Sequence, residues 1–582
     1  MTYQIDIQDA KTALQQGNHK RALKAALSAA KKSSTSPVAP NIAGIAASAS
    51  GKPAEAVRYF QRALKIKPDF TDAQKNLAQT LVLMGRADQA LIVLERLAIS
   101  SPEDWKIWYL KAQAEAATGS GRTALASTDF ALAQRGAPAA VYHLRSTINI
   151  SLGATRDAIT DLEHALDLNP HDVTALINLS LPLARQTRTA DALAVIRKAV
   201  ALAPDNVQAR FRLATQLVEM GEFDTGIAEY RTALTLDPLH PPTLERLAQL
   251  LPQTETAALE PSIRAALKKA VKHTTDRACL FFALSATLKA SGKGLEADKA
   301  LALANKELAG IAPYDARADA AFMHSITERF PAPVTPQTAA PAAPRPIFVI
   351  GLPRSGTTLV EAMLGAHPHI AALGERGTLG FLLDDTLVEG KPFTAQEIPA
   401  LLWEDTRLLP DLPEGTLAYV DKMPENYRLV GFLKAVYPDC RIINIRRDPR
   451  DIALSMWKSH FSGSLLSYAN DFEWMATKFN RYATTMTHWR GLFGDEIFDL
   501  HYEDLVADVE AASHRIAAFC GVAWHGAMAR PDLSADQVLT LSATQLRQPV
   551  HSGSVGKWRD SAALLAPLIA GLDRNLWAEY LE

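Results

Sequence analysis

A repeat of 34 residues constrains the fold of this chain more than any other feature. Three positions mark each unit: a glycine, a small residue five positions later, and a proline twelve positions after that. The glycine positions are Gly17, Gly51, Gly85, Gly119, Gly153, Thr187 and Gly221, and the small residues are Ala22, Ala56, Ala90, Ala124, Ala158, Ala192 and Gly226. The prolines are Pro68, Pro102, Pro170, Pro204 and Pro238, with Ser34 and Gly136 at this position in the other two units. This pattern predicts helix pairs, in which glycine makes the inner turn, the small residue lets the helices approach, and proline ends the second helix.

The repeat resembles the tetratricopeptide repeat, and Gly292 with Ala297 marks a degenerate capping pair beyond it. We therefore expect an all-α superhelical array over residues 1–310. Such arrays usually hold a peptide or protein segment in their concave groove. A peptide or protein partner is accordingly favoured, and a role in scaffolding or in forming a homo-oligomer is the alternative.

Composition limits the possible partners. The formal net charge of −2 argues against general binding of nucleic acid. The three cysteines are far apart and predict buried thiols rather than a disulfide framework. The first residues are polar and acidic, and no apolar run of about 18 residues occurs. We expect a cytoplasmic protein with no membrane partner.

A proline-rich stretch separates the array from the rest of the chain. Residues 331–346 contain six prolines in sixteen residues and predict a stiff, extended connector. The expected division is an array over 1–310, a linker over 311–345 and a second domain over 346–582.

A phosphate-binding loop opens the second domain. The buried strand expected at residues 347–350 is followed by Gly351 and Gly356 and then by an apolar helical stripe. In this layout, backbone N–H groups and a helix N-terminus hold an anion. The spacing matches G-x-x-x-x-G-K-[ST], but Thr357 replaces the lysine and the cation lies earlier, at Arg354. The loop therefore disfavours a triphosphate-cleaving enzyme, and a plain strand-to-helix turn is the simpler alternative.

The segment Pro353–Thr358 (PRSGTT) resembles the 5′-phosphosulfate loop of sulfotransferases that use 3′-phosphoadenosine 5′-phosphosulfate. The likeness extends to tyrosylprotein sulfotransferases through a His-Pro pair at 367–368 and a Gly-Glu pair at 374–375. The resemblance implies an α/β domain with a P-loop-like parallel sheet flanked by helices. It also implies a donor-binding set of Arg354, Ser355, Gly356, Thr357 and Thr358.

A second strand-to-helix junction carries Arg446, Arg447 and Arg450. Its position after a buried strand favours a local anion clamp over a solvated charge cluster. The resemblance implies that Arg447 and Ser455 bind the 3′-phosphate, with Pro449 where the family has glycine.

Four more site residues follow from the resemblance. Lys422 matches a lysine near the transferring sulfonate, and Tyr502 matches a tyrosine beside the nucleotide, with simple packing as its alternative role. Ser542 and Lys557 match a C-terminal loop that closes over the donor.

The resemblance also implies the chemistry. Glu375 would be the general base for the acceptor hydroxyl, with a helix-capping role as its alternative and His367 as the next candidate base. Arg354 and Lys422 would balance the developing charge. No metal is needed, and no histidine shows metal-ligand spacing. The expected function is sulfonyl transfer to a hydroxyl, possible acceptors including protein tyrosine, a carbohydrate or a small molecule. An inactive nucleotide-binding scaffold and a kinase-like enzyme are the other hypotheses.

Overall fold

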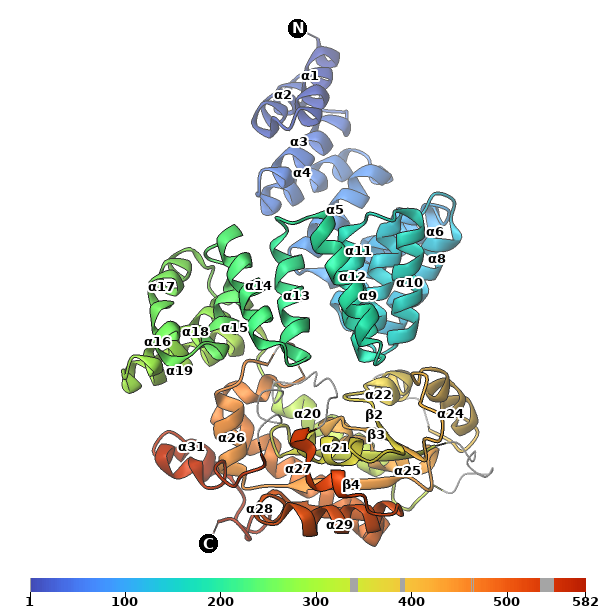
Figure 1. Ribbon diagram of the computed structural model, residues 1–582. Helices are drawn as coiled ribbons and strands as arrows, with labels where there is room; N and C mark the ends of the chain where they lie inside the picture. The colour runs from blue at the N-terminus through green and yellow to red at the C-terminus, as the bar shows by residue number, and fades with distance from the viewer. Residues whose placement is uncertain are drawn as a thin grey trace. The chain divides into compact units, whose positions relative to one another are not determined.

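The computed structural model describes residues 2–334, 344–387, 393–461, 463, 465–533 and 549–581. The chain forms two compact units, Met1–Ala175 and Leu176–Glu582. Figure 1 shows that the first unit is helical and that the second combines helices with a sheet. Among the described residues, no helix is long and apolar enough to cross a membrane.

The first unit consists of successive antiparallel helix pairs. Its helices are α1 (Tyr3–Gln15), α2 (His19–Lys32), α3 (Val38–Ala49), α4 (Pro53–Ile66), α5 (Thr71–Leu83), α6 (Ala87–Ser100), α7 (Trp105–Ala117), α8 (Gly121–Ala133), α9 (Ala139–Ser151) and α10 (Thr155–Leu168), and α11 (Val173–Arg185) spans the boundary.

The same helix pairs continue into the second unit. They are followed by shorter helices and by α20, which precedes the sheet. The helices are α12 (Thr189–Leu202), α13 (Val207–Glu219), α14 (Phe223–Leu236), α15 (Pro241–Leu250), α16 (Gln253–Ala258), α17 (Glu260–Lys269), α18 (Thr275–Ala290), α19 (Gly294–Ile311) and α20 (Ala316–Glu328).

The backbone explains why the three repeat positions are occupied as they are. Every glycine position has a left-handed backbone, with φ from 59° at Thr187 to 89° at Gly221. Gly292 in the capping pair has φ 75°. The alanines five residues later are fully buried, and a Cβ at Gly226 would lie 2.6 Å from Val218 Cγ2. The predicted helix-pair repeat is therefore confirmed.

A five-stranded parallel sheet forms the centre of the second unit. Its strands are β1 (Arg345–Gly351), β2 (Ile370–Ala372), β3 (Ala418–Asp421), β4 (Arg441–Arg446) and β5 (Ile497–His501). Their spatial order is β2-β3-β1-β4-β5, and all four pairings are parallel. After β1, the chain forms β2 and β3 on one side of β1 and then β4 and β5 on the other side. The strand order therefore reverses between β1 and β4. In open α/β sheets, ligands bind at this point, beyond the carboxyl ends of the strands.

Helices cover both faces of this sheet, as the sequence predicted (Figure 1). Ile347 and Val349 of β1 pack with apolar residues of α21 and α29, whereas Phe348 and Ile350 pack toward α25, α26 and α27. The helices of this part are α21 (Thr357–Gly365), α22 (Thr378–Leu382), α23 (Asp384–Leu387), α24 (Ile398–Arg407), α25 (Val430–Val436), α26 (Pro449–Trp457), α27 (Phe472–Phe493), α28 (Tyr502–Ala507), α29 (Val509–Cys520) and α31 (Ala566–Gly571).

The core on the α27 side of the sheet continues into the helices that precede the sheet. One apolar cluster contains residues of α18, α19 and α20 together with β1, α25, α26 and α27. A side chain such as Phe330, which is fully buried, packs edge-to-face on Phe432 and Trp489. On this side of the sheet, one continuous core therefore joins the last helices before the sheet to the sheet-containing part.

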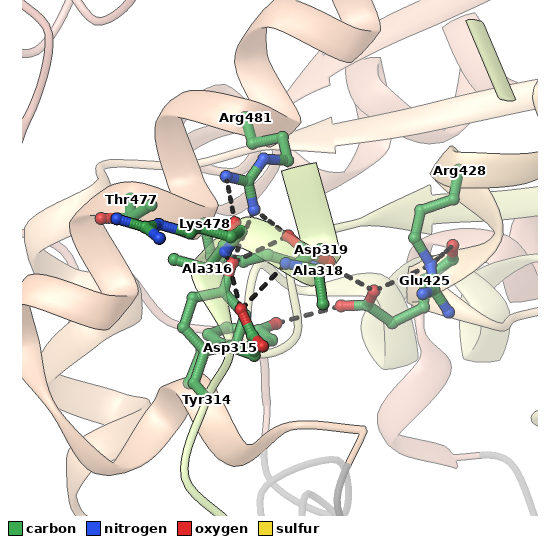
Figure 2. A network of polar contacts seen from close by, with 12 residues as sticks. Tyr314, Asp315, Ala316, Ala318, Asp319, Glu425, Arg428, Thr477, Lys478 and Arg481 are labelled. Carbon is green, nitrogen blue, oxygen red and sulfur yellow. Dashed lines mark hydrogen bonds and ion pairs between the residues drawn. The ribbon is translucent and has the colours of Figure 1, made fainter. Parts of the chain in front are cut away.

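A polar network fixes α20 to the sheet-containing part (Figure 2). Asp319 accepts from Tyr314 Oη at 2.7 Å and from Lys478 Nζ at 2.9 Å, and it also pairs with Arg481. Lys478 Nζ lies 3.8 Å from Glu425, which is nearly buried. Residues 316–328 of the expected linker therefore form a packed helix. Residues 335–343 lie outside the described residues, and the division into 1–310, 311–345 and 346–582 stays a prediction.

Candidate functional site

The loop after β1 has the geometry of an anion-binding turn. Gly351 has φ 147° and Gly356 has φ 111°, conformations that side chains rarely adopt. A Cβ at Gly351 would lie 2.7 Å from the Ile445 carbonyl oxygen, and one at Gly356 would lie 2.5 Å from the Tyr502 ring. The loop therefore needs both glycines, and it leads directly into the N-terminus of α21 at Thr357.

Arg354 occupies the tip of this loop in a left-handed conformation, with φ 70°. Its Nε donates to Ser455 Oγ at 3.0 Å, which links the loop to α26. Burial lowers the pKa of Arg354, and the nearby charge of Arg447 lowers it further. The positive charges of Arg354 and Arg447 repel each other, so a bound anion would offset this repulsion.

Arg447 joins three parts of the site. Its Nη1 donates to the Arg354 carbonyl at 3.0 Å, and its Nη2 donates to the Ser554 carbonyl at 2.8 Å. Its guanidinium carbon lies 4.2 Å from the centre of the Tyr502 ring, and the Tyr502 hydroxyl is 2.7 Å from Ser554 Oγ. Tyr502 therefore combines packing with a hydrogen bond.

Two buried donor atoms here have no hydrogen-bond partner among the described residues: Arg447 Nε and Ser355 Oγ. Buried polar atoms are nearly always paired, and each exception requires an explanation. Both atoms belong to the residues expected to hold phosphate groups. A bound anion with several oxygen acceptors is the ligand that would satisfy them.

The three arginines of the second junction do not act together as expected. Arg446 pairs with Glu579, and Arg450 pairs with Asp448 at 2.7 Å. Arg447 is the only one of the three that lines the described cavity. The clamp of three arginines is thus reduced to one, because carboxylates near in space neutralise the other two.

A cavity of about 770 Å³ lies at this edge of the sheet. Its lining includes nine of the predicted site residues: Arg354, Gly356, Thr357, Thr358, Glu375, Arg447, Ser455, Tyr502 and Lys557. Ser355, within the loop, is fully buried, and Ser542 lies outside the described residues. A volume of this size fits a nucleotide-sized ligand.

Glu375 lies on the cavity wall and Lys422 lies behind it. Lys422 follows β3, is fully buried, and donates from Nζ to Glu375 Oε1 at 2.6 Å. The Glu375 side chain is 50% exposed. The helix nearest in sequence, α22, has Gly377 at its N-cap and no side-chain cap, so the capping role considered for Glu375 is not observed.

Sequence reasoning missed Glu361, the second carboxylate at Lys422. Its Oε2 lies 3.8 Å from Lys422 Nζ, and its Oε1 accepts from the Gly374 N–H at 2.8 Å. Burial raises the pKa of Glu361, and the charge of Lys422 opposes that shift. Glu361 links α21 to the segment that carries Glu375. A single glutamate within an otherwise uncharged helix gave no sign of these contacts in the sequence.

Asp451 was also missed. It accepts from the Gly556 N–H at 2.6 Å and from the Trp558 N–H at 2.8 Å, and so fixes the segment that contains Lys557. His367, the alternative base, donates from Nε2 to the Ala523 carbonyl at 3.0 Å and does not line the described cavity. It is therefore not placed to serve as the base.

Comparison with known proteins finds family models that match separate parts of the chain. Residues 346–526 match the model of the sulfotransferase family. Tetratricopeptide-repeat models match residues 47–114, and residues 9–69 and 150–207. These matches agree with the resemblances found in the sequence.

Three relatives each match between a third and two fifths of the chain. The chain is 26% identical to protein-tyrosine sulfotransferase A of Caenorhabditis elegans, over 36% of this chain and 60% of that protein. It is 26% identical to protein-tyrosine sulfotransferase 1 of Danio rerio, over 39% of this chain and 71% of that protein. It is 29% identical to an uncharacterized protein of Aquifex aeolicus, over 39% of this chain but only 32% of that protein. The chain thus spans about a third of the Aquifex aeolicus relative and 60% of the Caenorhabditis elegans one.

Proposed function

Because a domain of the sulfotransferase family follows tetratricopeptide repeats in this chain, we propose that the protein transfers a sulfonyl group from 3′-phosphoadenosine 5′-phosphosulfate to an acceptor hydroxyl. The observation that carries the proposal is the pair of unpartnered buried donors, Arg447 Nε and Ser355 Oγ, beside a glycine-requiring loop. The donor nucleotide has a phosphate at each end, and Arg354, Arg447, Ser455 and Lys557 are the residues that would bind them.

In the proposed mechanism, the acceptor oxygen attacks sulfur in line with the bond to the leaving phosphate oxygen. Glu375 takes the proton of the acceptor hydroxyl, a new O–S bond forms, and 3′-phosphoadenosine 5′-phosphate leaves with the electrons of the broken bond. Lys422 holds the Glu375 carboxylate at the cavity wall through the 2.6 Å contact. Arg354 lies in the loop where negative charge builds on the leaving phosphate. These residues supply the charge balance without a metal ion.

The proposed acceptor is a tyrosine hydroxyl in a polypeptide. Two of the relatives are named protein-tyrosine sulfotransferases, which supports a tyrosine hydroxyl in a polypeptide. The repeats would then hold that polypeptide or another protein partner. The alternatives are a carbohydrate or small-molecule acceptor, or an inactive scaffold that binds the nucleotide but transfers nothing. A cytoplasmic location stays a prediction.

The donor is tested by calorimetry in the absence of Mg²⁺. We expect 3′-phosphoadenosine 5′-phosphate to bind at least about tenfold more tightly than ADP, and Arg447→Ala to lose at least about tenfold of that affinity. Arg530→Ala is the matched control, because Arg530 is exposed and does not line the described cavity. Equal affinity for the two nucleotides would contradict the donor assignment.

The acceptor is tested by product mass spectrometry. The protein is incubated with the sulfonyl donor and a mixed library of tyrosine peptides, sugars and phenols. Sulfonated tyrosine peptides are the expected products, and modification of sugars alone would replace the tyrosine acceptor. Donor binding without any sulfonated product would favour the inactive scaffold.

A further inference from the structure

One wall of the cavity is supported by a carboxylate from the repeat helices. His460 follows α26 and is one of the residues that line the cavity. Its Nδ1 lies 3.1 Å and 3.0 Å from the two carboxylate oxygens of Glu245, which belongs to α15. Glu245 is 5% exposed, so this contact is shielded from solvent. Residues 215 positions apart in the chain therefore form a partly buried pair at the proposed site.

Two further helices hold the same segment in place. The His460 ring stacks on Phe282 of α18, with ring centres 5.2 Å apart and an interplanar angle of 13°. Asn305 of α19 donates to the Trp457 carbonyl at 3.0 Å. Because three helices fix the backbone, the ring and one ring nitrogen, the orientation of His460 is set by the repeat side of this unit.

The hydrogen bond to Glu245 determines what the other nitrogen offers. An ionised carboxylate only accepts hydrogen bonds, so Nδ1 carries the hydrogen in this pair. In the neutral imidazole, Nε2 then presents a lone pair. His460 Nε2 is buried and has no hydrogen-bond partner among the described residues. A buried acceptor atom of a cavity-lining residue is a position for a donor group of a bound molecule.

We propose that Glu245 and His460 form an acceptor-binding pair, in which the carboxylate from α15 orients His460 so that Nε2 accepts a hydrogen bond from an N–H or O–H of the bound acceptor. This inference rests on the proposed sulfonyl transfer. Glu245 is a positioning residue in it, and His460 touches the substrate. The repeats thereby contribute directly to the binding of the acceptor as well as to any partner held elsewhere.

The surroundings of His460 favour the acceptor over the donor. Phe461, Leu465 and Leu466 line the cavity near it in sequence and offer nothing to a phosphate, and Lys458 is the one cation among the cavity-lining residues described from 458 to 466. The carboxylate of Glu245 behind the ring would repel an anion. The donor phosphates already have Arg354, Arg447 and Lys557 in the same cavity. A neutral acceptor with an aromatic or aliphatic body and a polar hydrogen suits this wall.

The same cluster could instead hold a metal ion, and the test must separate the two. Cys279 Sγ lies 3.7 Å from His460 Nδ1, and donor atoms of Glu245, Cys279 and His460 all lie within 4.8 Å of one another. Burial raises the pKa of the Cys279 thiol, and the charge of Glu245 adds to the shift, so the sulfur stays protonated unless a cation binds. A hydrogen-bonded pair with a neutral thiol satisfies the contacts without a metal.

The first measurement does not depend on activity. Histidine-selective ¹⁵N labelling reports which ring nitrogen carries the hydrogen, and His460→Gln identifies the signal of His460. We expect the Nδ1–H form in the wild-type protein and a loss of that preference in Glu245→Gln, with Glu255→Gln as an exposed control on α16. The Nε2–H form in the wild type, or no change in Glu245→Gln, would overturn the orientation.

The second measurement is steady-state kinetics on the acceptor found by mass spectrometry. His460→Leu should raise the acceptor KM by about tenfold, the cost of one hydrogen bond, with a smaller change in kcat. His460→Gln should recover part of the loss, because its amide reaches about the position of Nε2. The affinity for 3′-phosphoadenosine 5′-phosphate should stay within about twofold. Weakened nucleotide affinity with an unchanged acceptor KM would overturn the assignment to the acceptor.

Metal analysis completes the test. One equivalent of zinc that is retained through dialysis and lost in Cys279→Ser, but not in Cys520→Ser, would overturn the pair in favour of a metal centre. Failure of the wild-type protein to bind the nucleotide or to modify any acceptor would refute the proposed function instead. The nitrogen labelling would still decide whether Glu245 orients His460.

Discussion

At the scale of single residues, some side chains of the site line the cavity, and others are buried behind them and fix their positions. Glu375 and Arg447 line the cavity, whereas Lys422 is fully buried behind Glu375. Lys422 is also close to Glu361, which leaves one ammonium group shared by two carboxylates. The position of Glu375 therefore depends on a buried cation that solvent does not reach, and substitution of either partner should disturb catalysis more than nucleotide binding.

The variant Glu375→Gln tests the assigned base. The amide keeps the size of the side chain but cannot take a proton, so turnover should fall by about 10²–10⁴-fold. Affinity for 3′-phosphoadenosine 5′-phosphate, measured by calorimetry, should change by less than about tenfold. Glu414→Gln, at an exposed position outside the cavity lining, is the control. Retention of more than a few per cent of wild-type turnover would mean that another group accepts the proton.

The carboxyl of Asp421 predicts how stability depends on pH. Burial raises its pKa from 3.8 to about 8, although the charge of Arg376 opposes the shift. The folded protein holds this proton more tightly than the unfolded chain does. The contribution of Asp421 to stability is therefore complete below pH 3.8 and is lost as the pH rises through about 8.

Thermal unfolding of Asp421→Asn measures this effect. Between pH 6 and pH 8 the wild-type melting temperature should fall more steeply than that of the variant, since the amide does not titrate. Asp439→Asn serves as the exposed control. Parallel curves for Asp421→Asn and the wild type would show that Asp421 is ionised throughout this range in the folded protein.

At the scale of elements, the turn inside each helix pair is the repeated structural requirement. Thr187 adopts φ 59° at a position that glycine occupies in the other units. A branched side chain is strained in this conformation. Thr187→Gly should therefore stabilise the protein by about 0.5–1 kcal/mol, as the relief of strain exceeds the added entropy of the unfolded chain.

The reverse exchange provides the matched comparison. Gly153→Thr places threonine at φ 79° in the preceding unit and should destabilise the protein by about 1–2 kcal/mol. Denaturant unfolding gives both free energies. A Thr187→Gly variant that is less stable than the wild type would mean that the Thr187 Oγ1 bond to the Gln186 carbonyl, at 2.7 Å, outweighs the backbone strain.

Elements with a local signal were predictable from the sequence, and contacts between distant elements were not. The helix pairs and the loop at Gly351 depend on short spacings, and the structure has them where the spacings placed them. Asp451 and Glu245 gave no such signal, because their partners lie 105 and 215 residues away. Even a strong local cluster misled: Arg450 is neutralised by its sequence neighbour Asp448, and Arg446 by Glu579, a carboxylate that the fold brings near.

At the scale of the whole molecule, the compact units do not follow the composition of the chain. The proline-rich stretch suggested a boundary near residue 340, but the second compact unit begins at Leu176. The continuous core through α18, α19 and α20 explains the difference. We predict that residues 176–582 fold alone and bind 3′-phosphoadenosine 5′-phosphate with the affinity of the full chain, whereas residues 346–582 alone expose that core and aggregate.

Expression of the two fragments, followed by calorimetry and thermal unfolding, checks this prediction. A monodisperse fragment 346–582 with full nucleotide affinity would contradict the role given to the helices before the sheet. Loss of nucleotide binding in fragment 176–582 would instead make the first unit necessary for the site.

The shared core also bears on how such a chain changes over evolutionary time. Each helix pair in the first unit packs mainly on its neighbours, so a gene duplication or deletion of one 34-residue unit there leaves every remaining contact type intact. The helices from α15 to α20 have no such freedom, because their side chains are also part of the wall and core of the second unit. We therefore expect gain and loss of repeats to be tolerated among the helix pairs of the first unit.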